Sequence, residues 1–140
     1  MEVAILIALP TLFHYLIPVR AVVPRPYTYL GILVMLLGMA LMSRAAAMFR
    51  EAGTAFQLQE GSTALVTSGP FQFSRNPMYL GMLIWLIGLA VLLGSLSVFI
   101  FPLLFFLLAN FLFIPIEEKD MVQKLGDPYI AYKQRVRRWL

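Results

Sequence analysis

The sequence predicts an all-α integral membrane protein with four transmembrane helices, a cytoplasmic loop and amphipathic C-terminal helices. The 140-residue chain is 61% hydrophobic and 13% charged, and this charged fraction is about half that of an ordinary soluble domain. Residues 78–116 contain no Asp, Glu, Lys or Arg. As one helix this run would measure roughly 58 Å, nearly twice the ~30 Å hydrocarbon core of a bilayer. We therefore expect it to cross the membrane twice.

Four apolar segments define the expected spans, at 3–19, 27–49, 78–94 and 96–116. The prolines between the first two segments prevent one continuous helix. The last two segments are separated by a Gly-Ser-Leu-Ser sequence that begins at Gly94. A tight turn there would make them an antiparallel helical hairpin.

The distribution of Lys and Arg predicts the orientation. With four spans, both termini lie on the same side of the membrane as the connection between the second and third spans. That side carries nine Lys and Arg residues, whereas the other side carries Arg20 and Arg25. Positively charged loops remain in the cytoplasm, so both termini are expected there. Basic residues that flank apolar spans also explain the net charge of +4 without a nucleic-acid partner.

Two polar segments are expected on the cytoplasmic side, and the whole chain is expected to form one membrane domain. The loop 50–77 is rich in Gly, Ser, Thr and Gln, and its length exceeds that of ordinary helix connections, which is typical of functional loops. The tail 117–140 interleaves charged and apolar residues. This pattern predicts one or two amphipathic helices on the membrane surface, broken near Gly126 and Pro128.

The composition excludes several kinds of site. The chain has no cysteine, so it forms no disulfide and no cysteine-ligated zinc or iron–sulfur site. Its one histidine, His14, leaves no histidine cluster for a metal. No metal is therefore expected. The sequence leaves the oligomeric state open.

The expected hairpin begins and ends on the cytoplasmic side. The segment 75–79 at its start and Glu117 and Glu118 at its end should therefore meet at one membrane level. This topology predicts a composite site at the cytoplasmic interface. Asn110, a polar residue within the fourth span, is expected to hydrogen-bond to a neighbouring helix.

A purely structural role would also explain the segment around Asn76. Asn76 and Pro77 suit the start of a helix, where Asn caps free amides and Pro occupies the first turn. In this interpretation Arg75 contacts lipid phosphates and Tyr79 lies in the aromatic belt at the interface.

Two interpretations remain open for Glu117 and Glu118. Adjacent carboxylates beside an anionic leaflet are electrostatically unfavourable. They could occupy the first turn of a helix after Pro115, where the helix dipole favours negative charge. Alternatively, they form a carboxylate site for an ammonium group, a sulfonium group or ribose hydroxyls.

The order of the motifs gives a more specific indication. The chain contains LVTSGPF at 65–71 and RNPMYLG at 75–81, then a two-span hairpin, an adjacent Glu pair, and GDPYIAYKQRV at 126–136. This series resembles the isoprenylcysteine carboxyl methyltransferase and phospholipid methyltransferase group of membrane enzymes. The resemblance covers about residues 50–140.

The resemblance implies an S-adenosyl-L-methionine-dependent methyltransferase. In that group the loop, the hairpin and the tail enclose the cofactor at the cytoplasmic face, and a side opening to the lipid bilayer admits a lipophilic methyl acceptor. The residues implied in cofactor binding are Thr67, Asn76, Pro77, Tyr79, Gly81, Glu117, Glu118, Tyr129 and Tyr132.

Two departures from the family pattern keep other functions open. The family usually has His where this chain has Asn76, and the prenylcysteine enzymes carry an arginine shortly before the Glu pair, whereas 111–115 here has no cation. One alternative is a non-catalytic membrane module that binds lipid or a partner. The other is a small four-helix transporter subunit, although His14 and Arg44 are the ionisable residues within its spans.

Overall fold

The computed structural model describes residues 2–17, 21–52 and 65–140. Residues 18–19 of the first expected span and 53–64 of the expected loop lie outside the described residues. Within the described ranges every regular element is a helix, as the composition predicts. The longer elements are α1 (Glu2–Leu16), α2 (Leu30–Glu51), α3 (Pro77–Leu93), α4 (Ile100–Leu108), α5 (Ile114–Leu125) and α6 (Asp127–Arg135).

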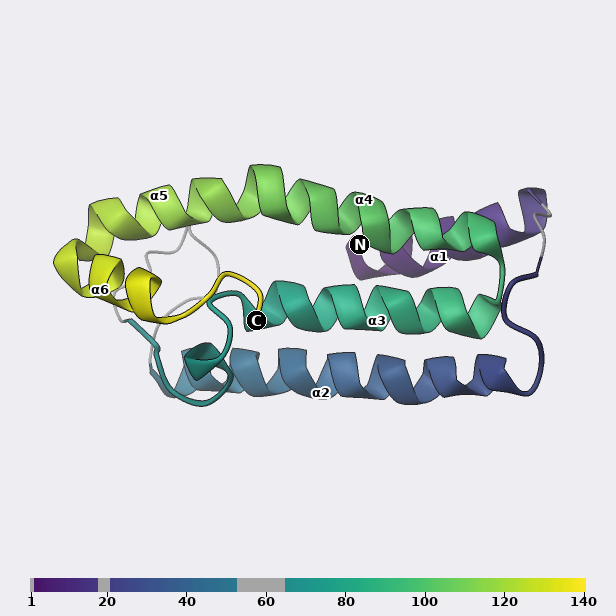
Figure 1. The fold of residues 1–140 in the computed structure, drawn as a ribbon, viewed down its shortest axis with the longest axis horizontal. Helices are drawn as coiled ribbons and strands as arrows, with labels where there is room; N and C mark the ends of the chain where they lie inside the picture. Colours follow the sequence, from purple (N-terminus) through teal and green to yellow (C-terminus); the bar gives the residue numbers. More distant parts are fainter. Residues whose placement is uncertain (1, 18–20, 53–64) are drawn as a thin grey trace.

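Helices α2 and α3 lie side by side along their length (Figure 1). Glycines allow this close approach, because Gly31 and Gly38 of α2 face Gly88 and Gly81 of α3. A Cβ atom at Gly38 would lie 2.5 Å from the carbonyl oxygen of Gly81, and one at Gly88 would lie 2.7 Å from that of Gly31. No side chain fits there without separating the two helices.

A glycine turn reverses the chain after α3. Gly94 has a φ of 69°, a left-handed conformation that suits glycine. Its N–H donates to the carbonyl of Ala90 at 2.9 Å, and its own carbonyl accepts from the N–H of Val22 at 2.9 Å. The same turn therefore ends α3 and holds the connection that follows α1.

The expected tail differs from the structure at its start. No separate helix begins at residue 117, because α4, the π-helical turn η5 (Ala109–Phe113) and α5 form one helix over Leu96–Leu125. Pro115 lacks the N–H that an uninterrupted α-helix requires, and the regular register is broken in the π turn just before it. The helix ends at Gly126, where φ is 61° and the sequence predicts a break.

Two helices are long and apolar enough to cross a membrane, Tyr27–Glu51 and Leu96–Leu125. The apolar helices Ile7–Leu16 and Pro77–Leu93 are shorter. Crossing of the membrane by four segments stays a prediction. Large apolar side chains are exposed along both long helices, among them Leu33, Leu36, Leu37, Leu103, Leu107 and Phe111.

We predict that Gly38→Ala destabilises the protein by about 1–3 kcal/mol, because the added methyl group must push α3 away. The measurement is thermal unfolding in detergent. Leu37→Ala is the matched control, since Leu37 is 59% exposed on the neighbouring position, and it should cost less than about 0.5 kcal/mol. Equal unfolding temperatures for the two variants would contradict the close packing of α2 and α3.

Candidate functional site

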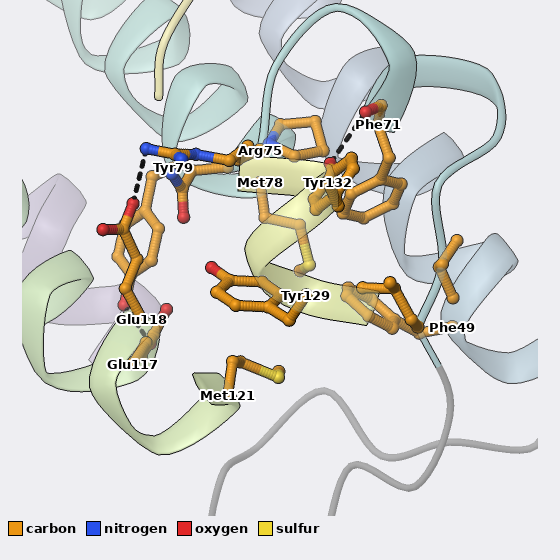
Figure 2. A pocket seen from close by; sticks show the side chains of 14 residues that line it. Phe49, Phe71, Arg75, Met78, Tyr79, Glu117, Glu118, Met121, Tyr129 and Tyr132 are labelled. Atoms are coloured by element: carbon orange, nitrogen blue, oxygen red, sulfur yellow. Dashed lines mark hydrogen bonds and ion pairs between the residues drawn. The ribbon is translucent and has the colours of Figure 1, made fainter. Parts of the chain in front are cut away.

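A cavity forms where the end of α2, the segment 65–79, the start of α5 and α6 come together (Figure 2). Its volume is about 80 Å³, whereas pockets for small molecules are typically about 300–1,000 Å³. Its polar wall consists of Arg75, Asn76, Tyr79, Glu117, Glu118, Tyr129 and Tyr132. Its apolar wall consists of Phe49, Leu65, Val66, Phe71, Pro77, Met78 and Met121.

The structure brings most of the expected site residues together. Seven of the nine residues that the sequence implies in cofactor binding line this cavity, and the exceptions are Thr67 and Gly81. Thr67 follows Val66, which is part of the wall. Gly81 packs against Gly38 and Met42 of α2, so in this structure it serves the contact between α2 and α3.

Asn76 stands at the N-cap position of α3, but its side chain makes no capping hydrogen bond. This overturns the expectation that its amide caps the helix. Its Nδ2 instead donates to the carbonyl oxygen of Arg138 at 3.0 Å, while its backbone N–H donates to Ser74 Oγ at 3.1 Å. Pro77 follows at the first helical position, where a missing N–H costs nothing.

Glu117 is held by a tyrosine from α3. Tyr79 donates its hydroxyl hydrogen to Glu117 Oε1 at 2.6 Å. The ring of Tyr79 stacks on Phe113, with centroids 6.4 Å apart. Burial raises the pKa of Glu117, although the hydrogen bond from Tyr79 acts in the opposite direction. Since the partner is an uncharged phenol, the negative charge of Glu117 is available to a cationic ligand.

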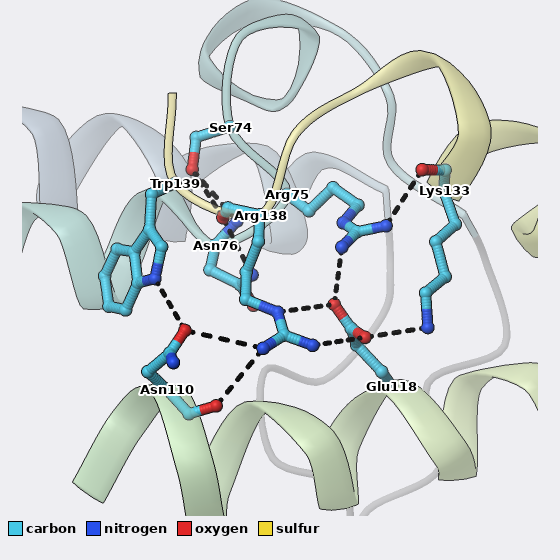
Figure 3. Close-up of polar contacts among 8 residues, drawn as sticks. All are labelled: Ser74, Arg75, Asn76, Asn110, Glu118, Lys133, Arg138 and Trp139. Carbon is cyan, nitrogen blue, oxygen red and sulfur yellow. Dashed lines mark hydrogen bonds and ion pairs between the residues drawn. The ribbon is translucent and has the colours of Figure 1, made fainter. Parts of the chain in front are cut away.

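Glu118 is shared by three cations. Arg75 lies 2.8 Å from one carboxylate oxygen, Lys133 lies 2.8 Å from the other, and Arg138 donates to both at 3.3 and 3.1 Å (Figure 3). The side chain of Glu118 is 5% exposed. Burial alone would raise the pKa of Glu118, but the three cations outweigh burial and the pKa lies below its ordinary value.

Arg75 is part of the same network and is not a lipid anchor. Its side chain is 8% exposed, and its second guanidinium nitrogen donates to the carbonyl of Lys133 at 2.9 Å. The expectation that it contacts lipid phosphates is therefore wrong. Its Nε is buried and has no hydrogen-bond partner among the described residues. The cavity wall thus contains a guanidinium with an unused donor.

Helix α6 closes the cavity with two tyrosines. Tyr132 donates its hydroxyl hydrogen to the carbonyl oxygen of Phe71 at 2.7 Å, which ties α6 to the short helix η3 (Gly69–Gln72). Burial, followed by the negative charge of Glu118, raises the pKa of Tyr129 to about 12. Both phenols are therefore neutral at physiological pH and can act as hydrogen-bond donors.

Arg138 and Trp139 were not predicted as site residues. Both contact Asn110, whose side-chain oxygen accepts from Trp139 Nε1 at 3.0 Å and from Arg138 at 3.4 Å. The partners of Asn110 thus lie in the C-terminal segment and not on a neighbouring helix. The position of Asn110 within an apolar run indicated that its side chain needs a hydrogen-bond partner, but not which residue supplies it.

We predict that Glu118→Gln destabilises the protein by about 3 kcal/mol, because it leaves a buried guanidinium without its countercharge. The measurement is thermal unfolding in detergent at neutral pH. Asp120→Asn is the matched control, since Asp120 pairs with Lys124 at the surface and such pairs contribute about 0.5 kcal/mol.

The same carboxylate should make stability depend on pH. Folding lowers the pKa of Glu118, so its contribution is present above the ordinary value of 4.5 and is lost as pH falls through the lower folded-state pKa. Glu118→Gln should flatten this acid-side loss, whereas Asp120→Asn should not. An unchanged acid profile in Glu118→Gln would contradict the role assigned to Glu118.

Comparison with known proteins extends these observations. Residues 26–127 match the family described as phospholipid methyltransferase. The protein-S-isoprenylcysteine O-methyltransferase of Saccharomyces cerevisiae is 37% identical over 117 residues, which cover 78% of this chain and 46% of that protein. The protein of the same name from Schizosaccharomyces pombe is 39% identical over 75 residues, 51% of this chain and 30% of that protein.

The chain thus spans less than half the length of these two curated relatives. An uncharacterized protein of Haemophilus influenzae is 40% identical over 63 residues, which cover 45% of this chain and all of that protein. The family match covers most of the chain and includes the cavity residues from Phe49 to Met121. The chain belongs to the phospholipid methyltransferase family.

Proposed function

We propose that this chain transfers a methyl group from S-adenosyl-L-methionine to a lipophilic small-molecule or lipid acceptor at the cytoplasmic face of a membrane. The proposal rests on one observation. A chain of a methyltransferase family brings Arg75 and Tyr79 into one cavity with Glu117 and Glu118. The two fungal relatives are named for methyl transfer to isoprenylcysteine, a lipophilic acceptor.

The polar wall suits the charges of this cofactor. S-adenosyl-L-methionine carries an ammonium and a sulfonium cation, a carboxylate and ribose hydroxyls. Glu117 can accept hydrogen bonds from the ammonium group or the hydroxyls, because its partner Tyr79 leaves its charge uncompensated. Arg75 can donate to the carboxylate through its unpaired Nε.

The aromatic wall suits the rest of the cofactor. Phe49, Phe71 and Tyr129 offer ring faces for an adenine base, and an aromatic face attracts a sulfonium cation. A volume of 80 Å³ accommodates part of such a ligand. Binding of the whole cofactor therefore requires side chains of the wall to move outward, among them Tyr129 and Tyr132 of α6 (Figure 2).

When bound, S-adenosyl-L-methionine supplies an electrophilic methyl group on a positively charged sulfur. The chain's own contribution is to orient the reacting groups and to exclude water. Orientation of two reactants can lower a barrier by about 7–11 kcal/mol. Asn76, which stands where the family usually has His, cannot carry a proton at neutral pH, and its amide is engaged by Arg138.

The membrane arrangement is part of the proposal. We infer that segments 3–19, 27–49, 78–94 and 96–116 all cross the bilayer and that the chain forms one membrane domain. The exposed apolar side chains of α2 and α4 support this arrangement, because soluble monomers rarely expose such large apolar surfaces. The excess of Lys and Arg supports a cytoplasmic position for both termini, and with them for the cavity.

Cofactor binding can be measured directly. Calorimetric titration of the solubilised chain should show saturable binding of S-adenosyl-L-methionine and of its demethylated product. Glu117→Gln should weaken both by roughly tenfold or more, because it removes a charge-assisted hydrogen bond. Asp120→Asn removes the same charge from the next turn of α5, outside the cavity, and should bind as the wild type does.

Two outcomes would contradict the proposal. Absence of binding in both detergent and lipid nanodiscs would remove the methyltransferase function. Binding without methyl transfer to any acceptor in a broad lipid panel would favour a non-catalytic membrane module. Equal binding by Glu117→Gln and the wild type would overturn the role of Glu117 alone.

The membrane topology can be tested by cysteine labelling. The chain has no cysteine, so a single introduced cysteine is the one thiol that a maleimide can modify. Leu96→Cys in the turn before α4 should react with a membrane-impermeant maleimide added outside intact cells. Gln134→Cys in α6 should react only after the cells are permeabilised. Labelling of both cysteines from the same side would contradict the hairpin arrangement of residues 78–116.

A further inference from the structure

The chain after α6 returns to the start of α3, and we call residues 136–140 the C-terminal strap (Figure 3). The N–H of Arg75 donates to the carbonyl of Arg137 at 3.0 Å. The carbonyl of Arg138 accepts from Ser74 Oγ at 3.3 Å and from Asn76 Nδ2 at 3.0 Å. Three successive residues before α3 thus bind two successive carbonyls of the strap.

The other side of the strap docks on the π turn η5. One guanidinium N–H of Arg138 donates to the main-chain carbonyl of Asn110 at 3.2 Å. Trp139 donates its indole N–H to the side-chain oxygen of Asn110 at 3.0 Å and packs its ring on Phe106, with centroids 5.2 Å apart. A π turn interrupts the regular α-helical hydrogen bonding, and such turns are frequent at functional sites.

The Arg138 guanidinium joins this docking site to the cavity. Its Nε and its other terminal nitrogen both donate to Glu118, so one planar group fixes the carboxylate at two points. Glu118 in turn binds Arg75, and both of these residues line the cavity whereas Arg138 does not. Arg138 therefore reaches the cavity wall through Glu118.

We propose that Arg138 is a positioning residue, which holds Glu118 and Arg75 in the orientation that binds the cofactor while the strap is docked on Asn110. Without Arg138, Glu118 keeps Arg75 and Lys133 but loses the two-point contact that fixes the plane of its carboxylate. Arg75 then loses its fixed partner. The proposal rests on the proposed function for the identity of the ligand.

Two adjacent arginines provide the test. Arg138→Gln should weaken binding of S-adenosyl-L-methionine's demethylated product by about five- to tenfold. Arg137→Gln removes the same charge one residue earlier, but the strap uses only the backbone carbonyl of Arg137. It should bind within about twofold of the wild type. Arg138→Lys should restore binding in part, because Lys keeps the charge and cannot bridge Glu118 and Asn110 as a planar fork.

A second readout measures docking of the strap without any ligand. The chain has two tryptophans, Trp85 and Trp139, so Trp85→Phe leaves Trp139 of the strap as the one tryptophan whose emission is excited selectively. In this background Arg138→Gln should red-shift the emission and increase acrylamide quenching, and Arg137→Gln should do neither. If Arg138→Gln does not fold, Trp139→Phe should weaken ligand binding in the original background, because it removes the indole hydrogen bond to Asn110.

The outcomes separate the two proposals. Increased quenching with unchanged ligand affinity in Arg138→Gln would overturn the positioning role. Equal effects of Arg137→Gln and Arg138→Gln would overturn it too, since net charge would then explain both. Full rescue by Arg138→Lys would do the same. Absence of binding to the wild type would overturn the proposed function and the affinity claim together, while quenching would still decide whether Arg138 docks the strap.

Discussion

A buried carboxylate must be paired with positive charges, and three separate parts of the chain supply them to Glu118. Arg75 comes from the segment before α3, Lys133 from α6, and Arg138 from the strap. Arg75 is nearly as buried as Glu118, with side chains 8% and 5% exposed, and breaking such a buried pair costs about 3–5 kcal/mol in typical proteins. The network therefore couples segments that lie up to 63 positions apart in the sequence.

The helical scaffold makes this convergence possible. Close contact at Gly38 and Gly81 fixes α3 against α2, and the turn at Gly94 returns the chain toward its starting side. The helix that follows continues through the π turn η5, past the last apolar residues, to Leu125. Glu117 and Glu118 are thereby carried on a rigid element to the level where α3 begins. Lys133 of α6 and Arg138 of the strap then add to the pairing of Glu118 with Arg75.

The sequence alone predicts the helical class and the meeting of residues 75–79 with Glu117 and Glu118, because run lengths and hairpin topology depend on composition that is visible in the chain. The strap could not be predicted in the same way. Its docking uses the backbone carbonyls of Arg137 and Arg138, which any residue type supplies. The π turn has no sequence pattern of its own. The continuation of one helix past residue 117 therefore could not be predicted either.

Neighbouring residues of identical chemistry acquire different roles here because successive positions on a helix point about 100° apart. Glu118 faces three cations whose total positive charge exceeds its own negative charge, so it does not attract a cationic ligand. Glu117 turns toward Tyr79, a neutral donor that orients the carboxylate and leaves its charge uncompensated. Burial, which raises the pKa of Glu117, increases the advantage of an arriving cation. A ligand with positive charge should therefore be recognised by Glu117, while Glu118 holds the wall against which it binds.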